Sequence, residues 1–139
     1  MMTFSPILYR IYVLEDNRAE TLVLKLAFSK MENVIIEYFN SATSFLQRLE
    51  QEIPDIVLMD YLLPDADGIE VIRKIKSKSD DIRIVVVSSQ EQVSVIAEAQ
   101  SEEIDNFIVK SPSCIRYLRK VMNDLIILVN YYKSIKGTW

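Results

Sequence analysis

A short apolar segment that ends on an aspartate constrains this chain more than any other feature. Residues 56–59 have the length and branching of a buried strand, and Asp60 follows them directly. A turn rich in Pro, Asp and Gly comes next, and an apolar pattern of helical spacing begins at Ile69. In sheets built from strand–turn–helix units, ligands bind beyond the carboxyl ends of the strands. Asp60 is therefore expected at that edge, where it either caps a tight turn or belongs to a functional site.

The alternation of strand and helix patterns continues along the chain. Each further strand is followed by an apolar pattern of helical spacing, and these strands are expected at residues 7–14, 34–39, 84–87 and 107–109. Asn17 is placed to cap the first helix, and Ser111 and Pro112 to cap and open the last. Five strands alternating with five helices predict an α/β fold, a parallel sheet with helices on both faces.

Composition restricts the kinds of function open to the chain. Its 139 residues fit one domain, and the net charge of −4 disfavours non-specific binding of nucleic acid. No segment has the pattern of a signal peptide or of a membrane span, so we expect a cytoplasmic protein without membrane insertion. A single cysteine, Cys114, excludes an internal disulfide, and the lack of histidine excludes an imidazole base, metal ligand or phosphohistidine.

Polar side chains are expected to converge where the strands end. They follow four of the five predicted strands and are Glu15, Asp16, Asp60, Ser88 and Lys110. Neighbouring parallel strands lie about 4.8 Å apart, so these groups can share one small volume. Crowded carboxylates repel one another unless a cation lies between them, and oxygen ligands without His or Cys favour Mg²⁺. A lysine and a hydroxyl group suit phosphoryl oxygens, which makes Asp60 a candidate nucleophile that forms an aspartyl phosphate.

In these positions the chain resembles the receiver domain of two-component response regulators. The matching residues are the pair Glu15 and Asp16, then Asp60, Pro64, Gly68, Ser88, Phe107 and Lys110. The likeness covers about residues 7–125 and implies a sheet with strand order 2-1-3-4-5. Residues 1–6 are then expected to be a flexible leader, and residues 126–139 an extension of the last helix with a C-terminal tail.

The resemblance implies a phosphoacceptor rather than an enzyme. Asp60 would accept a phosphoryl group from a phosphohistidine of a sensor histidine kinase or a histidine phosphotransfer protein. Asp16, Asp60 and the backbone carbonyl of Leu62 would bind Mg²⁺, and Glu15 would act beside them through water.

The resemblance also implies a switch that carries the signal onward. Lys110 would pair with one phosphoryl oxygen, and Ser88 would move to hydrogen-bond another. Phe107 would turn into the space that Ser88 leaves, so that a new dianion changes the surface formed by the fourth helix, the fifth strand and the fifth helix. A downstream protein would bind this surface.

Two loops depart from the usual pattern of the family. Ser111 stands between Lys110 and Pro112, where the family has proline directly after the lysine. The family's small, glycine-rich stretch before the last strand is replaced by residues 103–106, where Asn106 tolerates a left-handed backbone and Glu103 would be strained in one. Because no chemical group of the site is lost, we expect the site to be competent. A pseudo-receiver that signals without phosphate is the alternative that these loops favour.

The last helix carries an apolar pattern beyond the stripe that packs on the domain. A helix from Pro112 to Lys136 would be about 37 Å long, so its second half is expected to extend past the sheet and expose apolar surface. We expect a homodimer through this helix, with interface residues Leu125, Ile127, Leu128, Tyr131 and Tyr132. In the alternative, the helix breaks near Asn130 and the tail folds back on the domain.

No DNA-binding motif is recognisable after Lys120, so the leading interpretation is a single-domain receiver that signals by protein–protein contact and binds no nucleic acid directly. The chain could instead be a receiver fragment of a longer DNA-binding response regulator, which the spacing from Asp60 to Ser88 resembles. Two other classes fit less well. Haloacid-dehalogenase-type hydrolases need an aspartate where Leu62 stands, and a flavodoxin-like flavin binder needs a Ser/Thr/Gly-rich phosphate loop after the first strand.

Overall fold

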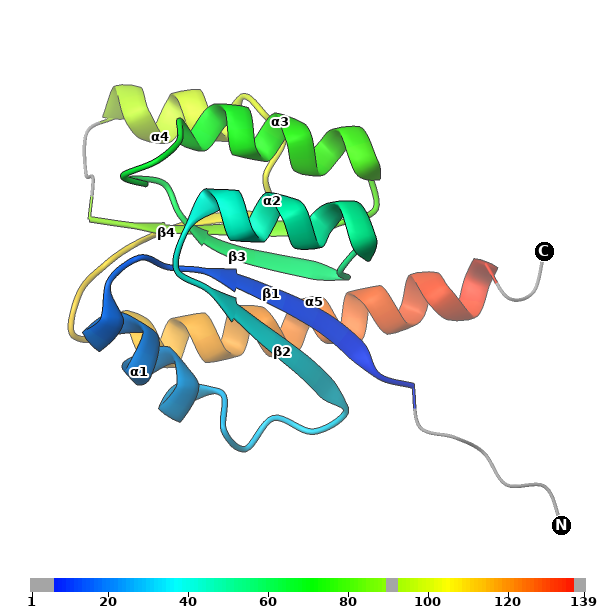
Figure 1. The fold of residues 1–139 in the computed structure, drawn as a ribbon. Coiled ribbons are helices and arrows are strands. Elements are labelled where there is room, and N and C mark those ends of the chain that lie inside the picture. Colours follow the sequence, from blue (N-terminus) through cyan, green and yellow to red (C-terminus); the bar gives the residue numbers. More distant parts are fainter. Residues whose placement is uncertain (1–6, 90–92, 137–139) are drawn as a thin grey trace, which may run out of the picture.

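A parallel β-sheet lies between two layers of helices in the computed structural model, which describes residues 7–89 and 93–136 (Figure 1). The strands are β1 (Tyr9–Leu14), β2 (Val34–Phe39), β3 (Ile56–Asp60), β4 (Arg83–Ser88) and β5 (Asn106–Val109). The helices are α1 (Arg18–Ala27), α2 (Ala42–Gln51), α3 (Gly68–Lys78), α4 (Val93–Gln100) and α5 (Cys114–Lys136). The leader predicted at residues 1–6 and the tail at 137–139 lie outside the described residues.

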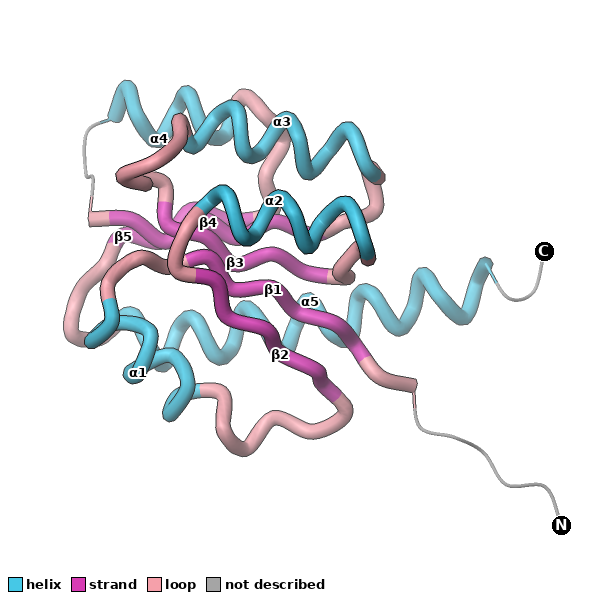
Figure 2. The backbone as a smooth tube through the Cα atoms, in the orientation of Figure 1, coloured by secondary structure: helices cyan, strands magenta, loops and turns pink. Residues whose placement is uncertain are grey.

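The strand order is β2-β1-β3-β4-β5, as predicted, and every neighbouring pair is parallel (Figure 2). The register aligns the carboxyl ends of the strands. Leu14 lies opposite Met59, and Asp60 lies opposite Val87. The residues that follow these strands therefore meet at one edge of the sheet.

Alternate residues of each strand enter two separate hydrophobic cores. In β1, Ile11 and Val13 pack with α1 and α5 on one face, whereas Tyr12 and Leu14 pack with α2 and α3 on the other. Figures 1 and 2 show α1 and α5 on one side of the sheet and α2, α3 and α4 on the opposite side. Burial on both faces explains why the central strands are continuously apolar in sequence.

Polar caps start the helices close to the carboxyl edge of the sheet. The side chain of Asn17 accepts a hydrogen bond from the backbone N–H of Glu20, which confirms the predicted cap of α1. Ser41 caps α2 and Asp67 caps α3 in the same way. These caps fix the first turns of α1 and α3, which lie on opposite sides of the sheet (Figure 1).

Helix α5 differs from its prediction at its first residue, whereas its last residue, Lys136, is the predicted one. It begins at Cys114 and not at Pro112, because a turn precedes it in which the N–H of Cys114 donates to the carbonyl of Ser111. Its last turns extend past the sheet, as predicted (Figure 1), but Leu125 and Val129 are buried in the core shared with α1. The prediction that Leu125 belongs to an intermolecular interface is therefore wrong, because this side chain already packs inside its own domain.

Polar contacts fasten the last turns of α5 to the amino-terminal edge of the sheet. The hydroxyl of Tyr9 donates to Asn130 Oδ1 at 2.7 Å, and Lys133 Nζ lies 3.0 Å from Asp55 Oδ1. The helix has 23 residues, about 35 Å of length, and continues unbroken to Lys136. It thus crosses the sheet from the site edge to the opposite edge and is held there, so the alternative, a break near Asn130, is not found.

The loop before β5 has the strained conformation that its sequence suggested. Within residues 7–89 and 93–136, positive φ occurs in non-glycine residues at Asn33 and Glu103, each with φ of 60°. Asparagine tolerates this region, but for most residues it costs roughly 1–2 kcal/mol. Asn106, the residue expected to tolerate it, lies instead in β5.

Two absences hold for the part of the chain that the structure describes. No peptide bond there is cis, so Lys110, Ser111 and Pro112 are joined by trans bonds. No helix there is long and apolar enough to cross a membrane.

Candidate functional site

Three carboxylates meet at the carboxyl edge of the sheet. Glu15 and Asp16 follow β1 and Asp60 ends β3, and one oxygen of each lies within 4.8 Å of the others. The side chains of Glu15 and Asp60 are only 5% and 9% exposed, whereas Asp16 is exposed to solvent. The structure thus brings together the three acidic residues that the sequence predicted, and their oxygens are the hard ligands that suit Mg²⁺.

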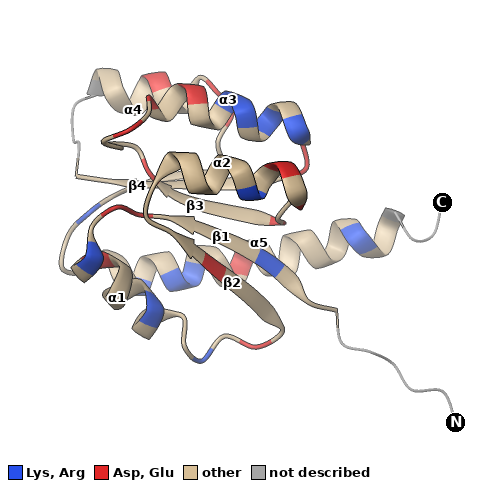
Figure 3. Cartoon of the chain, in the orientation of Figure 1, with Lys and Arg blue, Asp and Glu red and all other residues tan. Residues whose placement is uncertain are grey.

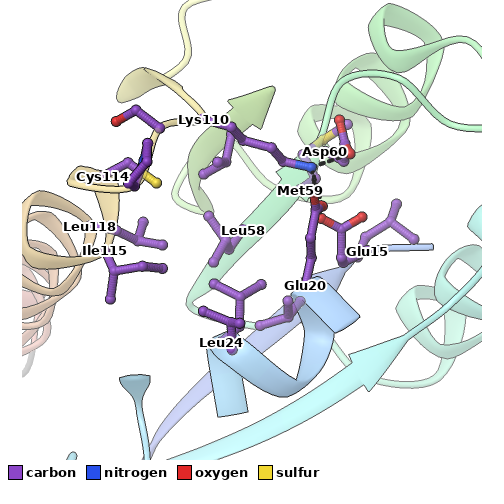
Figure 4. Close-up of a pocket in the computed structure, with 16 residues that line it drawn as sticks. Glu15, Glu20, Leu24, Leu58, Met59, Asp60, Lys110, Cys114, Ile115 and Leu118 are labelled. Atoms are coloured by element: carbon purple, nitrogen blue, oxygen red, sulfur yellow. Dashed lines mark hydrogen bonds and ion pairs between the residues drawn. The ribbon is translucent and has the colours of Figure 1, made fainter. Parts of the chain in front are cut away.

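Lys110 reaches this cluster from the end of β5 and contacts three carboxylates (Figure 4). Its Nζ lies 2.8 Å from Asp60 Oδ2 and 2.9 Å from Glu15 Oε1. The third partner is Oε2 of Glu20. The backbone N–H of Lys110 donates to the carbonyl of Ser88, which extends the pairing of β4 with β5 and holds the lysine at the edge. An ammonium group has three N–H donors, so these three carboxylates can engage all of them.

Glu20 also belongs to the site, although it was not among the residues predicted from the sequence. It lies in the first turn of α1, three residues after the cap Asn17, and its side chain is 43% exposed. A signal for it was present in the sequence, because a carboxylate in the first helical turn, four residues after Asp16, lies close to the same strand end. Its direction toward Lys110 depends on how α1 packs against the sheet.

Burial and crowding shift the protonation of the two glutamates in opposite directions. Burial raises the pKa of Glu15 to about 8, and its hydrogen bond with Glu20 adds to the increase. The pKa of Glu20 is lowered, first by that hydrogen bond and then by Lys110. Burial lowers the pKa of Lys110, but the bonds to Asp60, Glu20 and Glu15 outweigh burial and raise it overall. Burial thus favours the neutral form of Glu15, whereas the carboxylates around Lys110 favour its charged form.

The loop after β3 folds back tightly beside Asp60. The backbone N–H of Leu62 donates to Asp60 Oδ1 at 3.0 Å, and Leu62 forms an isolated antiparallel bridge with Asp67. A Cβ atom on Gly68 would lie 2.6 Å from the carbonyl oxygen of Tyr61. Glycine is thus needed here for space, and the close approach keeps the main chain of Leu62 next to the carboxylate.

The two residues of the predicted switch lie on β4 and β5. Ser88 is fully buried at the end of β4. Phe107 is half-buried against the core of α2 and α3, with its ring centroid 6.4 Å from that of Tyr61. The hydroxyl of Tyr61 donates to Glu98 on α4 at 3.1 Å. Burial is the main cause that raises the pKa of Tyr61 to about 12, and the hydrogen bond with Glu98 adds to the increase. A chain of contacts thus connects Phe107 with α4.

An apolar cavity of about 340 Å³ opens beside Lys110, between α1, α5 and the sheet (Figure 4). Its apolar wall includes Leu24 of α1 and Ile115 and Leu118 of α5. Glu15, Glu20, Asp60 and Lys110 form the charged part of its lining. A volume of this size is typical of pockets that receive a ligand or a partner's side chain.

The chain matches known proteins along most of its length. The family model "Response regulator receiver domain" matches residues 11–123. Response regulator MprA of Mycobacterium leprae is 29% identical over 103 residues, which cover 73% of this chain and 44% of MprA. MprA of Mycolicibacterium vanbaalenii is 30% identical, with 73% of this chain and 43% of that protein covered. The chain thus spans less than half the length of these curated relatives.

Solved structures share the fold. The phosphorylated cyanobacterial phytochrome response regulator RcpA has a TM-score of 0.70 and 25% identity, covering 82% of this chain and 88% of RcpA. A CheY-like receiver domain protein from Methanospirillum hungatei has a TM-score of 0.74 and 23% identity, covering 85% of this chain and 94% of that one. The stretch that matches the family model contains Asp16, Asp60, Ser88 and Lys110.

Proposed function

Because this chain belongs to the response regulator receiver family, we propose that Asp60 accepts a phosphoryl group from a phosphohistidine on a two-component kinase or phosphotransfer protein. The observation that carries the proposal is the contact of Lys110 with Asp60 inside a cluster of three strand-end carboxylates. A receiver domain is normally a phosphoacceptor and not a catalyst, so the partner kinase supplies the phosphoryl group.

Phosphoryl transfer at this site needs little from the protein beyond position and charge. An oxygen of Asp60 forms a bond to phosphorus while the bond from phosphorus to the histidine nitrogen breaks, and the electron pair of that bond stays on the imidazole. Lys110 would donate to one phosphoryl oxygen, and the hydroxyl of Ser88 to another.

The residues at the strand ends fit a Mg²⁺ site. Asp16, Asp60 and the backbone carbonyl of Leu62 would hold the ion, with Glu15 close to it. The fit rests on the three carboxylate oxygens within 4.8 Å of one another and on a donor set of oxygen alone. Bound Mg²⁺ supplies positive charge that neutralises the crowded carboxylates and the phosphoryl oxygens.

Helix α1 and the cavity beside it suit the docking of the phosphodonor protein. Leu22, Val23 and Leu26 of α1 are exposed although they are large and apolar, and Val23 also lines the cavity. Exposed apolar residues that border a cavity next to the reacting carboxylate are typical of a protein contact site. By contrast, Lys and Arg are spread over helices on both sides of the sheet, which does not favour nucleic-acid binding (Figure 3).

The proposed output is a change in the surface formed by α4, β5 and α5, which a downstream protein would bind. When Ser88 moves to a phosphoryl oxygen, Phe107 would turn into the space it leaves. The contact of Phe107 with Tyr61, and of Tyr61 with Glu98, supports a route from this movement to α4.

An intact mass measurement tests the phosphoacceptor. After incubation with Mg²⁺ and acetyl phosphate, the protein is expected to gain one phosphoryl group, and Asp60→Asn is expected to gain none because the attacking carboxylate is lost. Asp124→Asn, which changes an exposed aspartate on α5, serves as the matched control and should be modified like the parent. If the unmutated protein gains no phosphoryl group even after cold, rapid quenching, the proposal is contradicted and a pseudo-receiver is favoured. The alternative of a receiver fragment is tested separately, since it requires that the reading frame encode a longer protein.

Homodimerisation through α5 also belongs to the proposal, with a smaller interface than the sequence suggested. Ile127 and Tyr131 are 68% and 59% exposed and lie one helical turn apart. Tyr132 is also exposed, with Arg83 stacked on its ring at 4.9 Å, and Leu128 is half-buried. We expect the parent to have the mass of two chains at micromolar concentration in at least one phosphorylation state, and Ile127→Lys to have that of one. A parent mass of one chain in both states would exclude this dimer.

A further inference from the structure

We propose that Glu20 is a positioning residue that holds Lys110 in the resting site and releases it when Lys110 binds the phosphoryl group. The inference rests on the proposed function of Asp60 and assigns a role to a helix residue that the strand-end pattern does not include.

The hydrogen-bond capacity of Lys110 requires that one of its three carboxylate partners release it. Its three N–H donors face Asp60, Glu15 and Glu20, so the resting site leaves none for an incoming oxygen. A phosphoryl group on Asp60 adds acceptor oxygens next to the same ammonium. At least one of the present carboxylate partners has to give up its hydrogen bond.

Glu20 is the partner whose release is easiest. Asp60 itself carries the phosphoryl group, and Glu15 is almost fully buried beside the predicted metal ligands. Glu20 is 43% exposed, so water can solvate its carboxylate after it leaves Lys110. Its place in the first turn of α1 favours a negative charge in the released state as well.

The same position makes Glu20 a barrier to small anionic phosphodonors. Glu20 lines the cavity together with Asp60 and Lys110, so its negative charge lies where a free donor such as acetyl phosphate approaches. Even in water, the repulsion between two like charges about 4 Å apart is large enough to slow the reaction with such a donor about fivefold. The repulsion weakens as salt concentration rises, because ions screen exposed charges.

The test compares Glu20→Gln with Glu70→Gln in the full chain. Glutamine keeps the size of the side chain and removes its charge. Glu70 is the matched control because it also lies three residues after a helix cap, in the first turn of α3, and is exposed. Glu20→Ala is the second variant should Glu20→Gln fail to fold. Two quantities are measured: the rate at which an amine-specific reagent modifies Lys110, followed by peptide mass, and the rate of phosphorylation by acetyl phosphate with Mg²⁺ at low and high salt.

We expect Glu20→Gln to raise the reactivity of Lys110 and to speed phosphorylation about fivefold at low salt, with a smaller gain at high salt. Glu70→Gln should match the parent in both. If Lys110 is no more reactive in Glu20→Gln than in the parent, Glu20 does not hold Lys110. If its reactivity rises but the phosphorylation rate does not, the release of Lys110 from Glu20 is not a step that limits phosphorylation, and the proposal fails. Phosphorylation of neither parent nor variants would instead overturn the proposed function of Asp60, and the release step with it.

Discussion

The Lys110→Met variant is expected to lose about 3 kcal/mol of unfolding free energy at about pH 8 and much less at about pH 5. Methionine keeps the apolar stem of the side chain but removes the ammonium group. The carboxylates of Glu15 and Asp60, both almost fully buried, then repel each other and Glu20, because no cation lies between them. Removal of one partner from a buried charge cluster is far more costly than loss of an exposed pair.

The pH dependence of this loss follows from Glu15. Because the pKa of Glu15 is raised from 4.5 to about 8 by folding, the folded protein binds this proton more tightly than the unfolded chain does. Its contribution to stability is therefore complete below about pH 4.5 and is lost as pH rises to about 8. The lowered pKa of Glu20 acts in the opposite sense and offsets part of this slope. Without Lys110, charged Glu15 is still less favourable, so the slope steepens.

Urea unfolding at both pH values, with and without Mg²⁺, would measure the effect. The control is Lys120→Met, since Lys120 is 72% exposed and pairs with Asp124 on the surface of α5. We expect it to change stability by less than about 1 kcal/mol at either pH. Mg²⁺ should restore part of the stability of Lys110→Met, because it adds positive charge to the same carboxylates. Equal losses for the two variants at pH 8 would show that Lys110 does not neutralise a buried cluster.

The Gly68→Ala variant is expected to lose about 2 kcal/mol of stability and to bind Mg²⁺ about tenfold more weakly. Alanine would ordinarily stabilise a helix relative to glycine. Gly68 does not have a positive φ, so its backbone conformation is compatible with a side chain. The destabilisation is expected from a steric clash, since the added Cβ would lie 2.6 Å from the Tyr61 carbonyl oxygen. That oxygen cannot move without shifting Leu62, whose carbonyl is proposed to hold Mg²⁺.

Stability and Mg²⁺ affinity measured on the same samples separate these effects from a general loss of α3. Glu70→Ala is the control, because it changes an exposed residue of the same helix and the same first turn. We expect it to leave Mg²⁺ affinity unchanged. A Gly68→Ala protein as stable as the parent would mean that the loop after β3 yields easily, and the proposed link between this glycine and the metal site would be wrong.

The strands and the strand-end residues could be predicted from the sequence because their signals are local. A parallel strand covered on both faces must be apolar throughout, so residues 56–59 and 84–87 stand out without any knowledge of their partners. The edge of the sheet at which each strand ends follows from parallel alternation, and Asp60 and Lys110 meet there although 50 positions separate them. The strand order was taken from the family resemblance and is confirmed.

Helix α5 shows a property that local sequence patterns cannot predict, namely which surface covers its apolar residues. The excess of apolar residues after Leu125 was visible, but the sequence pattern could not tell a partner chain from the chain's own sheet as the surface that covers them. Contacts with Tyr9 and Asp55, far away in sequence, hold the last turns against the domain. Ile127 and Tyr131 remain exposed because they lie on the opposite side of the helix.

The sequence by itself thus determined the succession of strands and helices along the chain, the two buried faces of the sheet and the acidic residues with their lysine at one edge. Each of these follows from local hydrophobic periodicity and chain direction. Only the tertiary structure decided that Glu20 joins Lys110 and that Leu125 is unavailable to a partner. Both depend on how a helix is rotated and seated on the sheet, and that is set by side-chain packing between distant segments.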